Sequence, residues 1–246
     1  MMEQIADALA RNGFAYAPAS QMRPLLEKAG LRDWPEAWAS FAASWDDLGL
    51  DTYMADGGRY RKRRHAAFRV RGDAIERKPH QAHYQSRDYN ALNGGIARWF
   101  EPVTEETGAS PALRAILRTC AALFDPLSPA PDTSLLWPPS WHVEVHQFRV
   151  EARADAEGRP TPEGMHQDGV DWVLVLLVSR ENVAEGETRI AGPDKAPLGS
   201  FTLAEPMDAA LVDDSQVFHG VTPVVPVETS RPAHRDVLVV TFRREV

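Results

Sequence analysis

Cysteine is nearly absent from this sequence, and its scarcity excludes several classes of protein. The single thiol, Cys120, can form neither an intrachain disulfide nor a zinc site built from several cysteines. Long apolar runs are also missing, since the longest, Trp172 to Val178, is far shorter than the roughly 20 residues that span a bilayer. The first residues lack the apolar core of a signal peptide. The sequence therefore predicts a soluble, cytoplasmic protein with no membrane partner.

Positive charge is in the minority, with 27 lysines and arginines against 35 acidic residues and a formal net charge of −8. A nucleic-acid backbone repels a protein of this sign, so we expect no nucleic-acid partner. Hydrophobic residues make up 43% of the 246 residues, which is enough for a sizeable core without covalent cross-links. No internal repeat is present. We expect one domain spanning residues 1–246.

Residues 1–125 are expected to form a largely helical flanking region. Helical periodicity and end signals occur in four segments, at residues 3–13, 20–30, 34–45 and 110–124. The third segment carries an aromatic stripe from Trp34 to Trp45, which predicts the core face of a helix rather than a ligand platform. Cys120 lies on the apolar stripe of the last segment, so we expect a buried thiol.

A dense basic cluster, GGRYRKRRHAAFRVR, occupies residues 57–71 of this acidic protein. A charge run of this kind is most often a solvated face. The alternative is a set of guanidinium groups directed at a small carboxylate ligand, which arginine binds in a bidentate manner. Arg61 and Arg64 are the candidates for that second role.

The apolar period changes from 3.6 to 2 after a proline-rich connector at residues 125–141. The stretch HVEVHQFRV alternates, with Gln147 and Arg149 on one of its two faces. Short β-rich segments separated by Gly, Pro and Asp turns continue to the C-terminus, which is typical of a barrel, jelly roll or sandwich. We therefore predict a mainly β fold with helices, in which residues 140–246 form a jelly-roll core and the N-terminal helices pack on it.

Three residues of metal-ligand type share a spacing that indicates an iron site. His166 and Asp168 stand one residue apart in GMHQDGVDW, and His219 follows 51 residues after the aspartate in QVFHGV. In an extended chain, side chains two residues apart share a face, so the first pair can reach one point. Two histidines and one carboxylate form the facial triad that holds non-haem Fe(II) and leaves positions open for a cosubstrate and O₂.

The other histidines give weaker patterns. His142 and His146 would share a strand face and form a rival metal pair with Glu144 nearby, although a hydrogen-bonded structural role is more common for such residues. The remaining histidines have no patterned partner and are interpreted as surface or structural residues: His65, His80, His83 and His234.

An arginine near the C-terminus adds to the iron hypothesis. Arg235 opens the apolar strand HRDVLVVTF, 16 residues after His219, and shares a face with Val239 and Thr241. A guanidinium carried into the interior of a barrel is unfavourable unless it meets an anion. Arg231, in the preceding loop, is the competing arginine.

The stretches EGMHQDGVDWVLVLLVSRENVAEGET, DSQVFHGVTPV and HRDVLVVTF resemble the bacterial Fe(II)/2-oxoglutarate-dependent dioxygenases related to L-isoleucine hydroxylase. That family also includes hydroxylases of leucine-like and N-succinylated amino acids. The likeness extends to HYQSRDYNALNGGIARWF and VEVHQFRV, so it covers the chain from about Arg59 onward. The resemblance implies a cupin-like double-stranded β-helix that holds Fe(II) through His166, Asp168 and His219.

The same resemblance implies that 2-oxoglutarate is bound by Arg235, with Arg231 as the alternative and a hydroxyl contact from Thr222 or Thr241. Fe(II), 2-oxoglutarate and O₂ are the implied cofactors, and ascorbate is expected to stimulate the reaction. The implied reaction hydroxylates a small aliphatic L-amino acid, free or N-substituted, and forms succinate and CO₂.

An amino-acid substrate would need a cation for its carboxylate, a polar or acidic group for its amine and an aromatic wall. The candidates for these contacts are Arg149, Gln147, Asp171, Trp172, Arg61 and Arg64. Two other hypotheses remain open at this point. One is a 2-oxoglutarate oxygenase of a peptide or other small molecule, and the other is a metal-binding jelly roll that isomerises or senses a ligand without O₂. The second leaves Arg235 unexplained.

Overall fold

The computed structural model describes residues 1–128 and 138–245, so most of the proline-rich connector lies outside the described residues. The helices are α1 (Met2–Asn12), α2 (Ala19–Lys28), α3 (Trp34–Ala43), α4 (Glu105–Ala109) and α5 (Pro111–Phe124), with a 3₁₀ turn at Ser44–Asp47. The strands of the first half are β1 (Phe14–Ala17), β2 (Gly49–Leu50), β3 (Arg61–Arg71) and β4 (Ala74–Arg77). The later strands are β5 (Trp141–Ala152), β6 (Trp172–Glu181), β7 (Val183–Glu185), β8 (Glu187–Ala191), β9 (Pro197–Thr202), β10 (Ala209–Asp213), β11 (Phe218–Val221), β12 (Val224–Pro226) and β13 (Ala233–Arg244).

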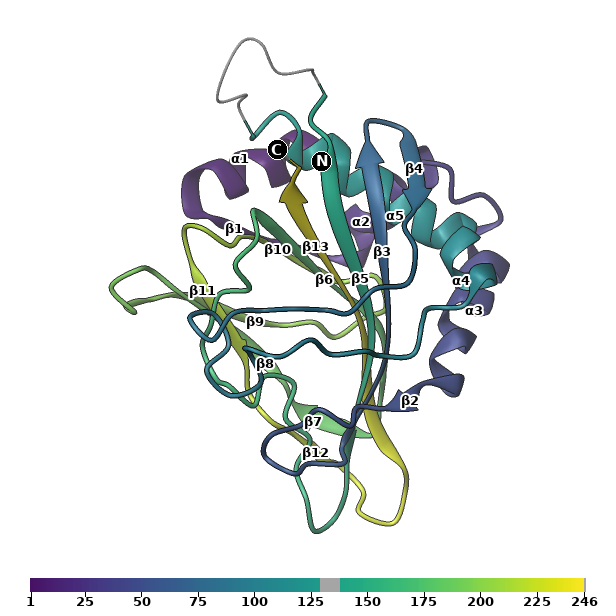
Figure 1. Ribbon diagram of the computed structural model, residues 1–246. Helices are drawn as coiled ribbons and strands as arrows, with labels where there is room; N and C mark the ends of the chain where they lie inside the picture. The colour runs from purple at the N-terminus through teal and green to yellow at the C-terminus, as the bar shows by residue number, and fades with distance from the viewer. Residues whose placement is uncertain (129–137, 246) are drawn as a thin grey trace.

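A large antiparallel sheet organises the molecule, with the strand order β1-β10-β6-β13-β5-β3-β2 and β4 paired to the outer side of β3 (Figure 1). Its centre is formed by the three longest neighbours, β13, β5 and β3. The register pairs Arg235 with Val150 and His65 with His146. Because directly opposed residues point to the same face, this register decides which side chains meet on each side of the sheet.

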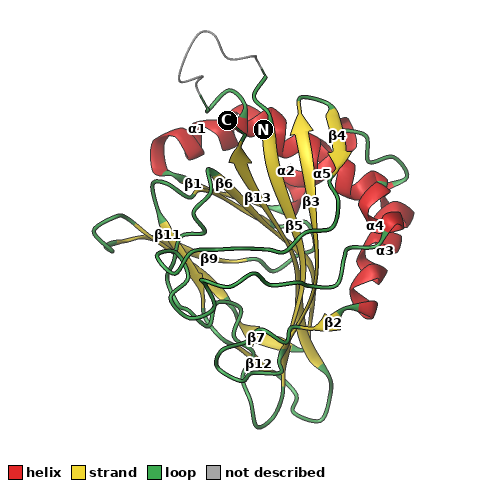
Figure 2. Cartoon of the chain, viewed as in Figure 1, coloured by secondary structure: helices red, strands yellow, loops and turns green. Residues whose placement is uncertain are grey.

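Helices cover one face of this sheet (Figure 2). Helices α1, α2, α3 and α5 contribute to the main apolar core, together with the side chains of β5, β6 and β13 that point towards them. The aromatic stripe of α3 lies in that core as predicted, with Trp38, Phe41 and Trp45 buried. Cys120 is buried there too, and burial raises the pKa of its thiol.

Two small sheets, β11-β8-β9 and β12-β7, lie on the opposite face of the large sheet (Figure 1). Apolar side chains from β6 and β10 meet those of β8 between these layers, including Val173, Val212 and Ile190. Two packed antiparallel layers with helices on the outside confirm the prediction of a mainly β jelly roll. No helix within residues 1–128 or 138–245 has the length and apolarity to span a membrane.

The expectation of a largely helical region over residues 1–125 is wrong for residues 49–77, which form β2, β3 and β4. Strand β3 is a central strand, and its alternation is hidden in the sequence because charged residues occupy both faces. Arg61, Arg63 and His65 point to the face that the small sheets cover, whereas Arg64 points to the other face. The prediction that the basic cluster is a solvated face is therefore wrong for Arg61, Arg63 and His65, whose side chains are buried.

Candidate active site

His166 and His219 are brought together by a two-residue antiparallel bridge between the loop before β6 and strand β11. The backbone N–H of each residue donates to the carbonyl of the other, at 2.9 and 3.0 Å. Opposed residues in such a pair point the same way, so the two imidazoles lie with their ring centroids 4.5 Å apart. The pairing explains how residues distant in sequence reach a common point.

Asp168 completes the group from the loop that leads into β6. Its Oδ2 lies 3.5 Å from Nε2 of His219, and its Oδ1 lies 3.7 Å from Nε2 of His166. One ligand atom of each of the three side chains falls within 4.8 Å of the others. The structure therefore assembles the three residues that the sequence analysis singled out.

The loop that carries Asp168 is held in place by Asp214, a residue that the sequence analysis missed. The backbone N–H groups of Asp168, Gly169 and Val170 donate to the Asp214 carboxylate at 2.9, 2.7 and 3.1 Å. Gly169 adopts a φ of +79°, and a Cβ there would lie 2.5 Å from the ring of Tyr89. The acidic pair just before QVFHGV was the only signal of this role.

The donor atoms fit a divalent transition metal. Nδ1 of His166 lies 3.0 Å from the carbonyl of Gly164, so this nitrogen donates its proton and Nε2 keeps its lone pair. The side-chain amide of Gln85 donates to Oδ1 of Asp168 at 3.1 Å and in turn accepts from Asn90 at 3.1 Å. Such supporting contacts orient the ligands of metal sites. The chemistry of this set, two imidazoles and one carboxylate, suits Fe(II).

Burial and neighbouring imidazoles together set the charge of Asp168. Burial by itself disfavours the ionised carboxyl, but the interaction with His219 and the charge of His166 outweigh it and hold the pKa of Asp168 below its usual range. The same contacts raise the pKa of His219 despite its burial. The carboxylate is thus ready to bind a cation at neutral pH.

Arg235 carries a buried guanidinium. It is 1% exposed, and its Nε and Nη2 have no hydrogen-bond partner among the described residues. Burial, and then the charge of Arg180, lower its pKa to about 10. An unpaired buried charge is strongly unfavourable, so the geometry fits an anion at this position. Val239 and Thr241, on the same face of β13, line the cavity that Asp168 also lines.

Arg231 is not a candidate for this anion site. It lies in the exposed turn before β13, and its guanidinium is 3.3 Å from the carboxylate of Glu228. The hydroxyl of Thr222 accepts from the backbone N–H of Glu187 at 2.8 Å, whereas Thr241 lines the cavity. Arg235 and Thr222 are not among the residues that line that cavity.

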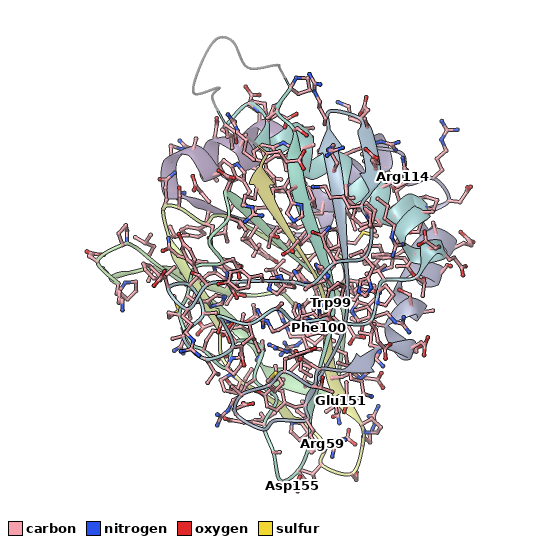
Figure 3. All side chains as sticks on the ribbon, viewed as in Figure 1. Arg59, Trp99, Phe100, Arg114, Glu151 and Asp155 are labelled. Atoms are coloured by element: carbon pink, nitrogen blue, oxygen red, sulfur yellow. The ribbon has the colours of Figure 1, made fainter. Side chains whose placement is uncertain are left out.

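A cavity of about 240 Å³ opens beside Asp168 on the face of the large sheet away from the helices. The segment from His83 to Phe100 crosses this face and closes the cavity, and Phe100 lies over the central strands (Figure 3). Four arginines line it: Arg61, Arg63, Arg98 and Arg243.

Most of the predicted substrate contacts lie elsewhere. Arg149 and Gln147 point to the helix-covered face of β5, where they bind Asp236 and Ser44 respectively. The prediction that Gln147 and Arg149 share a face of β5 is correct. The cavity lies on the opposite face of this strand, which carries Glu144 and His146.

Three further corrections concern residues outside the cavity. The guanidinium of Arg64 pairs with Asp47 at 3.0 Å on the outer side of β3. Trp172 stacks on Phe124 in the core, with centroids 5.0 Å apart. Asp171 accepts from the backbone of β13. Of the predicted substrate residues, Arg61 alone lines the cavity, and its Nε and Nη2 contact Oδ2 of Asp51 at 2.9 and 2.7 Å.

Two charged side chains of the cavity were not found from the sequence. Arg98 is 2% exposed, and its Nε and Nη2 have no partner among the described residues. Burial, and then the charge of Arg61, lower the pKa of Arg98. Oε2 of Glu163 is likewise buried without a partner in the described ranges. Arg98 lies within HYQSRDYNALNGGIARWF, so the resemblance in that stretch was the available signal.

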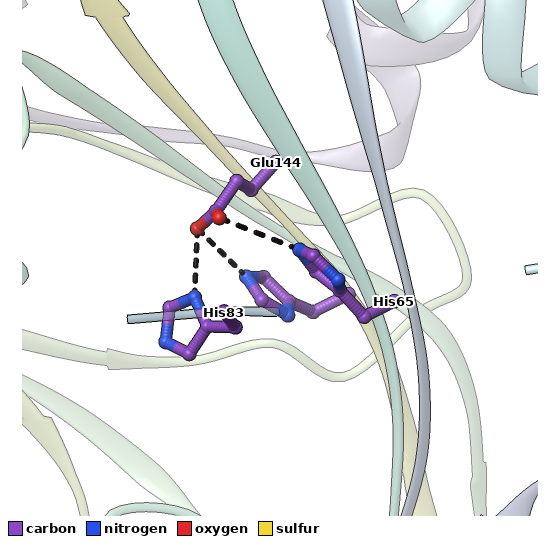
Figure 4. A group of neighbouring side chains, drawn as sticks. His65, His83 and Glu144 are labelled. Carbon is purple, nitrogen blue, oxygen red and sulfur yellow. Dashed lines mark hydrogen bonds and ion pairs between the residues drawn. The ribbon is translucent and has the colours of Figure 1, made fainter. Parts of the chain in front are cut away.

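Two of the histidines for which the sequence showed no patterned partner lie close together in the structure. His65 and His83 converge on the carboxylate of Glu144 (Figure 4), and with His146 they form a second group of ligand-type atoms within 4.8 Å of one another. Of the rival pair predicted from the sequence, His146 belongs to this group around Glu144. His142 does not, although its Nε2 lies 3.8 Å from the Glu144 carboxylate.

A jelly roll with a histidine–aspartate–histidine cluster at a buried cavity defines a non-haem iron oxygenase as the class of protein. A model of the 2OG-Fe dioxygenase family matches residues 42–241. The chain belongs to this family and is a 2-oxoglutarate-dependent dioxygenase. Members of the family employ Fe(II), 2-oxoglutarate and O₂.

Two curated proteins are similar over much of the chain. A 3(1)-hydroxy-L-isoleucine 4-dioxygenase from Pantoea ananatis (strain AJ13355) is 25% identical over 99% of this chain and 96% of its own length. An L-isoleucine-4-hydroxylase from Bacillus thuringiensis is 29% identical over 65% of this chain and 64% of its own length.

Solved structures give the same fold. A bsmA homologue from Methylobium petroleophilum PM1 has a TM-score of 0.85 and 36% identity, covering 98% of this chain and 92% of that one. IDO from Bacillus thuringiensis has a TM-score of 0.79 over the whole of both chains, and its 19% identity supports the fold alone.

Proposed function

We propose that this dioxygenase hydroxylates a small aliphatic L-amino acid and forms succinate and CO₂ from 2-oxoglutarate and O₂. In this proposal His166, Asp168 and His219 hold Fe(II), and Arg235 binds the distal carboxylate of 2-oxoglutarate. The relatives named for isoleucine and hydroxy-isoleucine support the substrate class.

The residues of the chain have distinct parts in the reaction. The bound metal and cosubstrate supply the oxidising chemistry. Asp168 and the two histidines would hold the metal, and Asp168 lines the cavity in which the substrate would bind. Arg235 fixes the cosubstrate at the far end, and the apolar side chain of Val239 helps to exclude water from the space between them.

The observation that carries the proposal is that Asp168 and the unpaired Arg98 line one small cavity. Buried guanidinium nitrogens without a hydrogen-bond partner favour an anionic ligand, and the carboxylate of an amino acid supplies it. The cavity, about 240 Å³, is below the roughly 300–1,000 Å³ typical of sites for drug-sized ligands. This size favours an amino acid over a peptide.

The free amino acid is the better fit than an N-substituted one. Glu163 lines the same cavity, and its Oε2 lacks a partner among the described residues, so it can accept a hydrogen bond from an ammonium group. An N-acylated substrate would carry no such cation and would leave this carboxylate buried and unpaired. Arg98 and Glu163 together match the two charges of a zwitterion.

The test is succinate release by purified protein supplied with Fe(II), 2-oxoglutarate, O₂ and ascorbate. We expect succinate with free aliphatic L-amino acids, less with their N-acetyl and N-succinyl derivatives, and none with a tripeptide. Omitting ascorbate tests its expected stimulation. Absence of succinate with every compound, together with absence of Fe(II)-dependent 2-oxoglutarate binding, would overturn the proposal.

Two variants assign the substrate contacts. Arg98→Gln is expected to raise KM for the amino acid on the order of tenfold to a hundredfold while sparing the affinity for 2-oxoglutarate. Glu163→Gln should reduce the preference for the free over the N-acetylated compound. Arg64→Gln, on the outer face of the same sheet, is the matched control and is expected to leave KM unchanged.

A further inference from the structure

A second cluster of metal-ligand side chains lies on the central strands, apart from the histidine–aspartate–histidine group. His65 on β3 stands directly opposite His146 on β5, and Glu144 lies two residues before His146 on the same face. His83 reaches the cluster from the segment that crosses the sheet. Nδ1 of His83 lies 2.8 Å from Oε2 of Glu144, and Nε2 of His65 lies 3.4 Å from Oε1 (Figure 4).

His65 is the least explained member of this cluster as a structural residue. Its side chain is fully buried, and neither ring nitrogen has a hydrogen-bond partner among the described residues. Buried polar atoms are nearly always paired, yet Nδ1 of His65 has no contact of this kind among the described residues and Nε2 has only the long 3.4 Å contact with Oε1 of Glu144, so this imidazole points to a missing ligand. Its Nε2 is directed at the same carboxylate that His83 contacts (Figure 4).

The protonation of its ring nitrogens makes His146 a poorer candidate ligand than His65, His83 and Glu144. Nη2 of Arg63 lies 2.6 Å from Nδ1 of His146 and can only donate there. Neutral His146 therefore carries its proton on Nε2, the nitrogen that faces Glu144. This leaves two imidazoles and one carboxylate as the candidate ligands: His65, His83 and Glu144. Nδ1 of His83 donates to Oε2 of Glu144 at 2.8 Å, and a cation bound between them would displace that proton.

The charges around this group are compensated in part. Asp51 contacts Arg61 at 2.7 Å and Arg63 at 3.5 Å, so one buried carboxylate offsets the two nearest arginines. Glu144 adds a second negative charge, and desolvation does not neutralise it because the surrounding imidazoles keep its pKa low. A bound cation would therefore face acids as well as arginines.

We propose that His65, His83 and Glu144 form a second binding site for a divalent transition metal of the zinc type. Two imidazoles and one carboxylate are a ligand set of zinc enzymes in which a fourth position stays open. His83 and Glu144 line the cavity, so the open position faces it and is available to water or to an anionic ligand near Arg98. The proposal does not depend on the substrate assigned to the enzyme.

The experiment measures Zn²⁺ bound per chain after dialysis against defined free zinc, using elemental analysis and calorimetry. The Asp168→Ala variant, which removes a ligand of the first cluster, should still bind one ion. Adding Glu144→Gln or His83→Ala in this background should weaken that binding at least tenfold. His80→Ala, three residues before His83 and outside the cluster, is the matched control and should bind as the parent does.

Far-ultraviolet circular dichroism establishes that each variant is folded, and the isosteric Glu144→Gln keeps the test valid if His83→Ala unfolds. Binding that persists at full affinity in both Glu144→Gln and His83→Ala would overturn the proposal. A parent Asp168→Ala protein that binds no ion would overturn it as well, and neither result would bear on the hydroxylase assignment.

Discussion

The two ligand clusters lie on the same cavity but are built in opposite ways. The first cluster, His166, Asp168 and His219, stands on a loop and a short strand, and backbone hydrogen bonds fix it. The second, His65, His83 and Glu144, takes two of its three members from the long central strands of the sheet. The first cluster can be predicted from the sequence because His166 and Asp168 stand only two residues apart. The residues of the second cluster are far apart in the sequence, and the pairing of β3 with β5 brings two of them together.

The electrostatic surroundings also differ. Two acids lie near the first cluster. Asp214 accepts from the backbone N–H of Asp168, and the carboxylate of Glu163 lies 3.7 Å from Nε2 of His166. Near the second cluster lies a cation, Arg63, which contacts His146 and is offset in part by Asp51. Because cations are attracted to the first environment and partly repelled by the second, we expect the first cluster to bind metal more tightly. Two sites with the same types of ligand can therefore differ in metal affinity, because the charges around the ligands differ.

The largest expected effect comes from removing the carboxylate of the first cluster. Asp168→Ala should reduce succinate formation to below about one-hundredth and abolish Fe(II)-dependent 2-oxoglutarate binding, because ligand loss exceeds the tenfold to hundredfold effect of supporting residues. Coupled succinate assays and calorimetry measure the two quantities. Asp171→Asn, three residues later and outside the cavity, serves as the control.

The reverse pattern would break the comparison. If Asp168→Ala kept its turnover while Glu144→Gln lost it together with 2-oxoglutarate binding, the iron would belong to the second cluster. The assignment of the two clusters would then have to be exchanged.

Arg235 gives the next largest effect. Arg235→Ala should weaken 2-oxoglutarate binding on the order of a hundredfold or more, since truncating one partner of a buried charged contact costs about 2–5 kcal/mol. The apparent KM for 2-oxoglutarate at saturating Fe(II) measures it. Arg231→Ala, in the exposed turn, should leave this KM unchanged, and an equal effect of both substitutions would contradict the anion site at Arg235.

Asp214 separates positioning from ligation within the first cluster. Asp214→Asn should weaken Fe(II) binding roughly tenfold to a hundredfold, because an amide group holds the three backbone N–H groups of the Asp168 loop less strongly than a carboxylate. Fe(II) titration under anaerobic conditions measures the change. Asp213→Asn is the matched control, since Asp213 contacts Ser215 and Gln216 instead. Unchanged iron affinity in Asp214→Asn would remove the positioning role.

The same contrast explains how far the sequence could lead. Alternation and turn residues predicted the later strands, and the spacing of His166, Asp168 and His219 predicted their cluster. Arg235 was distinguished from Arg231 only by burial in the structure. Strand β3 was missed because its charged residues resemble a solvated run, although two of them, Arg61 and Arg63, line the cavity and contact Asp51.

Substrate contacts were the least predictable part, and the reason is geometric. Periodicity tells which residues share a face, but it does not tell which face is covered by helices. Gln147 and Arg149 were therefore assigned to the wrong side of β5, and the neighbouring face with Glu144 and His146 was weighed as a rival pair only. Arg98 could not be recognised from any periodic pattern, since its role depends on the path of a loop across the sheet.

The smallest expected effect is a thermal shift that compares the clusters in one protein. In the Asp168→Ala background, Zn²⁺ at tenfold excess over its Kd should stabilise the fold by about 1.4 kcal/mol through binding linkage. For a chain of this size that corresponds to a rise in Tm of roughly 3–6 °C, measured by scanning calorimetry. The double variant Asp168→Ala/Glu144→Gln should show no rise at the same zinc concentration. An equal rise in both proteins would mean that zinc binds elsewhere, and the second cluster would then be a network of hydrogen-bonded imidazoles around Glu144.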